Sequence, residues 1–198
     1  MITVVGFAWG TAYKDEVQGW WDSVQALNPP ADDIVVAYHP DDDCGALNLP
    51  CRLVECRTRT CDAMINAAVA TVGEGWVAPL AMDDRFYPDA FSCLPDNLDK
   101  IADVVANTLK FMSHGGANPS APEMFATESM RNHVMGTSWF TKDIWTRTGG
   151  YPSVYWSDWA FLVEVSCAWC AMVQACWCAN VGERYSDEPY LIGFTYRG

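Results

Sequence analysis

Strand-like and helix-like segments alternate through the first hundred residues, and this order constrains the fold more than any other feature. Residues 2–8 form a short, uncharged, β-branched run, which is typical of a strand buried on both faces. Residues 14–27 place apolar side chains at helical spacings and end in Asn-Pro-Pro, which predicts a helix. The other expected elements are strands at 32–39, 51–57 and 76–82 and a helix at 60–72. This alternation predicts an α/β fold with a mixed, mainly parallel central sheet flanked by helices.

The second half of the chain has a less regular pattern. Its expected elements are strands at 102–112 and 134–140, a helix at 141–150, a loop at 113–123 and a longer helix that starts at Ser157. Thr141 suits the N-cap of the 141–150 helix and Gly149 suits its termination. Because no internal repeat and no linker-like run interrupts the sequence, we expect a single domain over residues 1–198.

The composition excludes several classes of protein. Apolar residues make up 51% of the chain and charged residues 19%, so the composition excludes intrinsic disorder and a coiled coil. The formal net charge of -13 disfavours binding of a nucleic-acid phosphate backbone over an extended surface. A nucleic-acid partner would therefore need a local basic patch or bound metal ions.

The cysteines and the N-terminus indicate a cytoplasmic protein. Nine cysteines are an odd number, and no cation precedes Lys14 as a signal peptide would require, so we expect mostly buried thiols. A CxxC followed by a CxC could instead supply four thiolates for zinc, although no knuckle-forming glycine separates the two pairs. The four cysteines are Cys167, Cys170, Cys176 and Cys178.

Residues 160–181 have the length of a membrane span. Polar side chains interrupt this segment at Glu164, Gln174 and Asn180. We therefore expect a helix followed by a strand and no membrane span.

Asp83 and Asp84 follow the expected strand at 76–82 directly. Ligands bind beyond the carboxyl ends of strands in open α/β sheets, and paired carboxylates there hold hard divalent cations that neutralise phosphates. The alternative interpretation is a solvated acidic turn.

The order of motifs around this acid pair resembles a known family. Residues 66–91 resemble the nucleotide-sugar-binding core of family-2 glycosyltransferases of the GT-A fold: an Asn-led helix, a Gly-Glu turn, a buried strand, an acidic metal motif and a Pro-Asp helix start. Residues 134–165 resemble the acceptor-side half of that family, with Gly-Gly-Tyr and an acid before Trp at a helix start. The N-terminal segments fit more loosely, and the resemblance extends over about residues 2–187.

The resemblance implies a single, Rossmann-like GT-A domain with a nucleotide-sugar-binding half at 1–100 and an acceptor-side half at 101–198. It implies transfer of a sugar from a nucleoside diphosphate sugar, with a UDP-sugar expected, to an acceptor hydroxyl, by a metal-dependent and inverting reaction. The cofactor it implies is a divalent cation, manganese or magnesium. The acceptor stays open among a glycan, a protein and a modified nucleic acid.

The resemblance also assigns roles to individual residues. Asp84 matches the metal-binding acid and Asp83 its neighbour, which contacts the metal or the donor's ribose, while Ala81 stands in place of the first acid of the fuller pattern. Asp158 matches the general base, with Ser157 in place of the preceding Glu. The residues expected on the donor side are Ala8, Trp9, Tyr38 and Asn66.

Further candidates come from side-chain chemistry. A guanidinium suits phosphate geometry, so Arg57, Arg59 and Arg85 are candidate contacts of the donor diphosphate, although each could equally be a surface residue. The aromatic residues shortly before the expected base could stack on an acceptor sugar or belong to the core. They are Tyr151, Tyr155 and Trp156.

Two alternatives to a glycosyltransferase stay open. A catalytically silent binding module with the same fold would account for Ala81, Ser157 and the lack of an acid at Tyr38-His39. A nucleotidyltransferase shares the sheet and the carboxylate-bound metal, but residues 6–14 are a poor version of its phosphate loop.

Overall fold

The structure is a computed structural model of the chain. It describes residues 1–11, 13–82, 84–86, 88–91, 104–107, 139–153, 161, 172–176, 178–180 and 190–194. The elements of the first ninety residues are β1 (Ile2–Ala8), α1 (Val17–Gln25), β2 (Asp33–Tyr38), the 3-10 helix η1 (Ala46–Asn48), β3 (Arg52–Glu55), α2 (Cys61–Ala70), β4 (Trp76–Pro79) and β5 (Asp84–Phe86). Those that follow are β6 (Val104–Asn107), β7 (Trp139–Thr141), α6 (Lys142–Thr148), β8 (Met172–Cys176), β9 (Cys178–Asn180) and β10 (Tyr190–Phe194).

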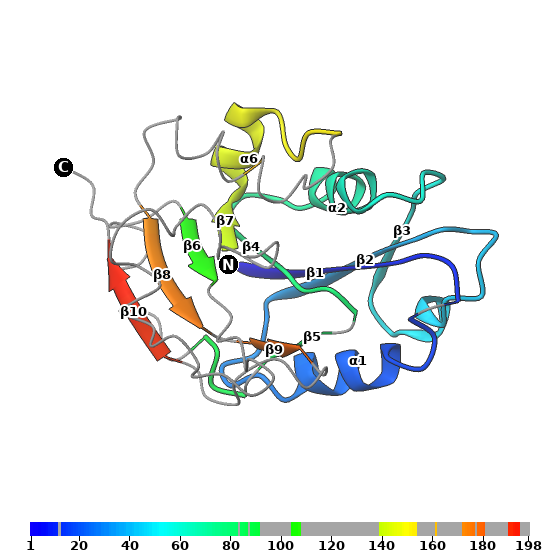
Figure 1. The fold of residues 1–198 in the computed structure, drawn as a ribbon, viewed down its shortest axis with the longest axis horizontal. Coiled ribbons are helices and arrows are strands. Elements are labelled where there is room, and N and C mark those ends of the chain that lie inside the picture. The colour runs from blue at the N-terminus through cyan, green and yellow to red at the C-terminus, as the bar shows by residue number, and fades with distance from the viewer. Residues whose placement is uncertain are drawn as a thin grey trace, which may run out of the picture.

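The described strands form a mixed sheet in the order β10-β8-β6-β7-β4-β1-β2-β3 (Figure 1). Strand β1 pairs in parallel with β2 and β4, and β2 pairs in parallel with β3, so one half of the sheet is entirely parallel. Strand β7 is antiparallel to both of its neighbours. This arrangement confirms the predicted α/β class and its mainly parallel centre.

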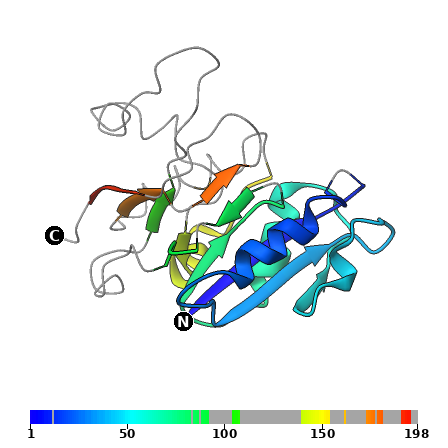
Figure 2. The ribbon, with the colours of Figure 1, turned by 90° about the horizontal axis from the view of Figure 1, so that it is seen from below.

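Successive residues of the central strands point to opposite faces of the sheet, as the strand period of two requires. Val4 and Val36 pack against one helix layer, and their neighbours Val5 and Val35 pack against the other. Helix α1 covers the first face, whereas α2 and α6 cover the second (Figures 1 and 2). Burial on both faces explains why these strands are continuous apolar runs.

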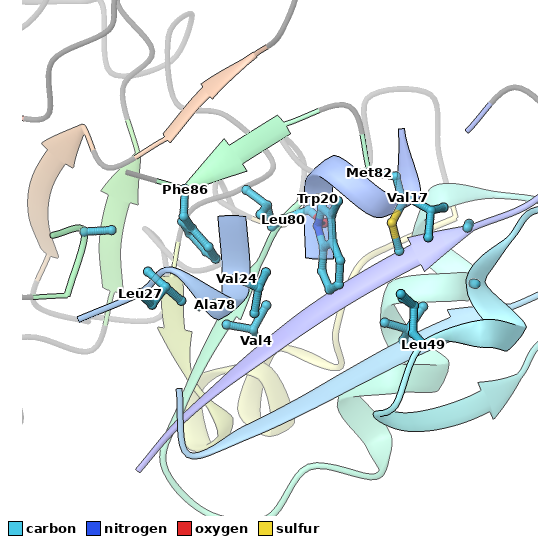
Figure 3. Packing of buried hydrophobic residues seen from close by; sticks show 14 of the residues in the cluster. Val4, Val17, Trp20, Val24, Leu27, Leu49, Ala78, Leu80, Met82 and Phe86 are labelled. Atoms are coloured by element: carbon cyan, nitrogen blue, oxygen red, sulfur yellow. The ribbon is translucent and has the colours of Figure 1, made fainter. Parts of the chain in front are cut away.

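The α1 face is organised around Trp20, which is fully buried among side chains of β1, β4 and β5 (Figure 3). Its indole lies against Gly6, where a Cβ would approach the ring to 2.6 Å. Its Nε1–H donates to the Leu80 carbonyl at 3.2 Å. A side chain at position 6 would therefore push α1 away from the sheet.

The course of the chain after β4 differs from the prediction. The sequence predicts one strand over 76–82 that ends at the acid pair. In the structure β4 ends at Pro79, and Asp84 begins a separate strand, β5. A turn in which the Asp84 N–H donates to the Ala81 carbonyl at 3.0 Å separates the two strands. Strand β5 pairs antiparallel with β9 in a second, two-stranded sheet. The local apolar pattern could not reveal this turn, because Leu80 before it and Met82 within it are both buried.

The short helix in the second half has the predicted ends. The Thr141 hydroxyl accepts the Ile144 N–H at 3.3 Å, and Gly149 closes the helix in the left-handed conformation with φ of 82°. The loop predicted at 113–123 and the start of the helix predicted from Ser157 lie outside the described residues. Within the described parts of the chain, no helix has the length and apolar character needed to cross a membrane.

Candidate functional site

The parallel strands β1, β2 and β3 end at one edge of the sheet, so the loops that follow them converge there. Ligands of open α/β sheets bind at this edge. The predicted donor residues Ala8, Trp9 and Tyr38 lie at the ends of β1 and β2, and Arg57 and Arg59 lie just beyond the end of β3. The structure therefore gathers these residues at the edge where a donor nucleotide was expected.

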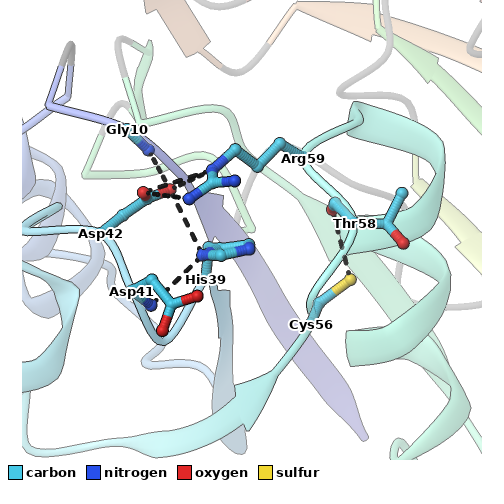
Figure 4. Close-up of polar contacts among 7 residues, drawn as sticks. All are labelled: Gly10, His39, Asp41, Asp42, Cys56, Thr58 and Arg59. Carbon is cyan, nitrogen blue, oxygen red and sulfur yellow. Dashed lines mark hydrogen bonds and ion pairs between the residues drawn. The ribbon is translucent and has the colours of Figure 1, made fainter.

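The carboxylate of Asp42 ties the three loops together (Figure 4). One of its oxygens accepts the backbone N–H of Gly10, from the loop after β1, at 2.6 Å. The carboxylate also binds the Arg59 guanidinium through two nitrogens, with Nη2 to Oδ1 at 2.8 Å and Nε to Oδ2 at 2.9 Å. His39 Nδ1 lies 3.7 Å from Oδ2. We call Gly10, His39, Asp42 and Arg59 the Asp42 cluster.

The electrostatics of this cluster favour the ionised carboxylate. The hydrogen bond from Arg59, followed by that from the Gly10 amide, lowers the pKa of Asp42 well below its usual range. The side chain of Asp42 is 11% exposed, whereas that of Arg59 is 49% exposed. The cluster thus presents a guanidinium to solvent above a fixed carboxylate.

His39 is buried beneath this ion pair. Its Nδ1 accepts the backbone N–H of Asp41 at 3.2 Å, so the imidazole supports the turn that carries Asp42. No acid occupies the Tyr38-His39 strand end itself. Asp42, three residues further on, returns to the same edge. The run of aspartates after Pro40 was the available signal in the sequence.

Arg57 and Arg59 differ although they follow the same strand. The Arg57 side chain is 71% exposed and pairs with Glu55 at 2.8 Å, back along β3. Arg59 instead reaches across to the loop after β2. Of the two, Arg59 is the guanidinium that the structure joins to the ends of β1 and β2.

Trp9 supplies an aromatic surface beside the cluster. Its indole is half-buried and stacks on Phe7, with ring centres 6.0 Å apart and planes at 16°. Tyr13 meets the same indole edge-on at 5.7 Å. These contacts hold a flat π surface at the end of β1, next to the Gly10 amide.

Asp84 lies at the first position of β5 and is only 6% exposed. Among the described residues, no group of three or more His, Cys, Asp or Glu side chains is arranged to hold a metal ion. Asp83 and Asp158 lie outside the described residues. Asp84 is therefore the described carboxylate of the expected metal site, and its chemistry suits a hard cation.

Arg85 has a different environment from the one predicted for a diphosphate ligand. Its Nη2 donates to Glu16 Oε2 at 2.5 Å and to the Glu16 carbonyl at 3.1 Å. Its Nη1 donates to the carbonyls of Met82 and Asp84, each at 2.8 Å. The guanidinium therefore braces the segment that carries Asp84 against the start of α1.

Asn66 and Tyr151 also take unexpected positions. The Asn66 amide bonds to the backbone of Tyr151, 85 residues away. The Tyr151 ring is 4% exposed and stacks on Phe161 with centres 4.3 Å apart, so it belongs to the core and not to an acceptor surface. Tyr155 and Trp156 lie outside the described residues, as do the side chains of the cysteines considered for zinc.

A concavity of about 570 Å³ opens at the opposite edge of the sheet, at the amino ends of β1 and β4. It is lined by Met1, Glu74, Gly75, Trp76, Thr141, Lys142, Asp143 and Thr146. None of the predicted donor residues lines it. The concavity is therefore distinct from the edge that carries the Asp42 cluster.

Solved structures match this fold although sequence comparison finds no relative. No protein-family model matches the chain, and no curated protein matches it by sequence. The structure of S. aureus TarS 1-349 in complex with UDP-GlcNAc matches 97% of this chain and 60% of the TarS chain, with a TM-score of 0.70 and 12% identity. The complex of TarS 1-349 with UDP matches 93% of this chain with the same TM-score and identity.

A second protein matches less closely. The mannosyltransferase PcManGT from Pyrobaculum calidifontis, in complex with GDP-Man and Mn2+, matches 83% of this chain and 51% of its own, with a TM-score of 0.62 and 15% identity. The present chain thus spans about three fifths of the TarS chains. These likenesses confirm the GT-A-like fold predicted from the sequence.

Proposed function

We propose that this chain transfers a sugar from a nucleoside diphosphate sugar to an acceptor hydroxyl. The observation that carries the proposal is the fold, which matches proteins whose structures hold UDP-GlcNAc and GDP-Man. The Asp42 cluster supports it, because it builds a fixed polar site at the sheet edge where α/β proteins bind their ligands.

The donor nucleotide, a UDP-sugar in this proposal, lies against the ends of β1 and β2. The Trp9 indole offers a stacking surface for the base, and Ala8 and Tyr38 border it. The Arg59 guanidinium, half exposed and already oriented by Asp42, is the phosphate contact. Arg57, turned toward Glu55, contributes little to the proposed site.

Asp84 and Asp83 are the proposed ligands of a divalent cation, manganese or magnesium. The PcManGT structure contains Mn2+ together with its GDP-Man. A bound cation would neutralise the charge that develops on the departing diphosphate. Asp84 is suited to this role because it is nearly buried at a strand start that the Arg85–Glu16 pair braces.

Asp158 is the proposed general base of an inverting transfer. An acceptor hydroxyl is a weak nucleophile until a carboxylate accepts its proton, and a positioned base supplies roughly 10²–10⁴-fold in rate. Asp158→Asn should therefore retain donor affinity and lose transfer. The acceptor stays open between a glycan and a protein, because the net charge of -13 disfavours a nucleic acid.

A donor screen tests the proposal. The protein is incubated with UDP- and GDP-sugars, with manganese, with magnesium or with EDTA, and the released nucleoside diphosphate is measured. We expect slow, metal-dependent hydrolysis of one donor, and its loss in Asp84→Asn. The matched control is Asp22→Asn, which removes an exposed carboxylate that Gln18 contacts on α1.

Two other outcomes would contradict the proposal. Metal-dependent donor binding without any turnover, with or without acceptors, would indicate a silent binding module, for which Ala81 and Ser157 still argue. Release of pyrophosphate from a nucleoside triphosphate would indicate a nucleotidyltransferase.

A further inference from the structure

The side chain of Asn66 joins two parts of the chain that lie far apart in sequence. Asn66 belongs to α2, and its Oδ1 accepts the Trp145 Nε1–H at 3.0 Å and the Tyr151 backbone N–H at 2.9 Å. Its Nδ2 donates to the Tyr151 carbonyl at 2.8 Å. We call Asn66, Trp145, Gly150 and Tyr151 the Asn66 joint.

These bonds use three of the four hydrogen-bonding positions of the Asn66 amide. A side-chain amide accepts two hydrogen bonds at its oxygen and donates two from its nitrogen. The oxygen of Asn66 is therefore saturated, and one N–H is committed to Tyr151. An amide in this state cannot accept a hydrogen bond from a donor nucleotide without breaking the joint.

The turn at residues 149–151 is shaped around this amide. Gly149 and Gly150 both have positive φ, 82° and 80°. A Cβ on Gly150 would lie 2.6 Å from Asn66 Oδ1 and 2.8 Å from Trp145 Nε1, whereas a Cβ on Gly149 would have no atom within 4 Å. Glycine at position 150 thus allows the backbone to close onto the amide.

Other contacts anchor the two sides of the joint. The Tyr151 ring packs against both Phe140 and Phe161, with centres 6.0 and 4.3 Å away. Lys142 lies over the Trp145 ring at 4.0 Å and donates to the Val69 carbonyl at 2.5 Å, so α6 stays attached to α2 without Asn66. Loss of the Asn66 amide should therefore change the turn while the fold persists.

We infer that Asn66 is a positioning residue, which fixes the turn at 149–151 against α2 and so sets where the following chain starts. Asp158, the proposed base, follows Tyr151 by seven positions in the sequence. The inference rests on the proposed function, and it replaces the donor contact that the sequence suggested for Asn66. A displacement of about 1 Å in a catalytic arrangement costs roughly 10²-fold in rate, even when its cause lies far from the reacting atoms.

The experiment compares Asn66→Ala with the wild type in donor affinity, transfer rate and hydrogen exchange of the Tyr151 amide. We expect the donor Kd to stay within about twofold, kcat to fall by roughly 10²-fold, and the Tyr151 amide to exchange faster. Asn66→Asp keeps the acceptor oxygens but cannot donate to the Tyr151 carbonyl. Its kcat should therefore lie between those of the wild type and Asn66→Ala. Thr146→Ala, which removes an exposed hydroxyl bonded to Lys142 on α6, is the control and should change none of the three quantities.

Each other outcome has a definite meaning. A donor Kd weakened tenfold or more, with Tyr151 exchange unchanged, would show that Asn66 contacts the donor and would overturn the inference. Normal transfer by a folded Asn66→Ala protein would also overturn it and would leave the proposed function intact. A wild-type protein that binds and turns over no nucleotide sugar would overturn the proposed function and with it the catalytic part of the inference. If Asn66→Ala does not fold, Asn66→Asp serves for the same measurements.

Discussion

The Asp42 cluster and the Asn66 joint are both built around one polar side chain, but they differ in charge and in exposure. In each, one short side chain collects hydrogen bonds from segments far apart in sequence. Asp42 is charged, and its partner Arg59 is half exposed at the sheet edge. Asn66 is neutral, and its partner Tyr151 is buried in the core.

This difference distinguishes the proposed binding role of the Asp42 cluster from the proposed positioning role of the Asn66 joint. A guanidinium that is half solvated can turn toward a phosphate at little cost, because water already satisfies some of its donors. A neutral amide whose partners are mostly buried backbone groups cannot change partners without leaving those groups unsatisfied. Ligand exchange is therefore expected at the Asp42 cluster and not at the Asn66 joint.

The largest effect is expected at Gly150 of the joint, with the neighbouring Gly149 as its comparison. Gly150→Ala adds a clash with the Asn66 amide to a left-handed backbone, and should lower the free energy of unfolding by about 3 kcal/mol or more. Gly149→Ala has the same backbone strain without the clash and should cost about 1–2 kcal/mol. Urea unfolding of both variants measures the difference, and equal losses would mean that the turn is not closed around Asn66.

Removing the Asp42 carboxylate should weaken donor binding without unfolding the chain. In Asp42→Ala, the loops after β1, β2 and β3 lose their common partner and must be ordered by the ligand itself, so we expect about tenfold weaker donor affinity by calorimetry. Asp43→Ala is the matched control, since this neighbouring acid is exposed and pairs with Lys14. Donor affinity that falls equally in both variants would point to general charge rather than to the cluster.

The charge of Asp42 also predicts a dependence on pH that the Asn66 joint lacks. The folded state depresses the pKa of this carboxyl below its ordinary value of 3.8, so its contribution to stability is complete above about pH 4 and is lost as the pH falls further. The melting-temperature difference between wild type and Asp42→Asn should shrink on acidification below pH 4. The corresponding difference for Asn66→Ala should stay constant over the same range, and a parallel decline in both would contradict the contrast.

The smallest effect is expected for Arg57→Ala. Its guanidinium is exposed and pairs with Glu55 at the surface, so the free energy of unfolding should change by less than about 0.5 kcal/mol. Donor affinity should stay within about twofold in Arg57→Ala. It should fall further in Arg59→Ala, which removes the proposed phosphate contact. Calorimetry on the two variants makes this test, and a tenfold loss for Arg57→Ala would restore its predicted place beside the diphosphate.

Features that depend on neighbouring residues were predictable from the sequence. Uncharged β-branched runs marked the buried strands, and Thr141 and Gly149 marked both ends of α6, because a cap acts within one turn of its helix. The end of β4 was predicted wrongly. Burial continues through Leu80 and Met82 beyond the last paired residue, and an apolar pattern records burial rather than strand pairing.

The roles of single polar residues depended on contacts between distant parts of the chain. The sequence showed that this is an α/β protein, because hydrophobic periodicity and turn residues act locally. The GT-A-like fold was expected from a resemblance in the order of its motifs. The partners of Asp42 and Asn66 lie up to 32 and 85 residues away. No local pattern encodes such pairings, since they arise only when the sheet aligns strand ends and packs α6 on α2. That alignment placed Asp42 where the loops after β1, β2 and β3 meet, and it turned Asn66 toward Tyr151.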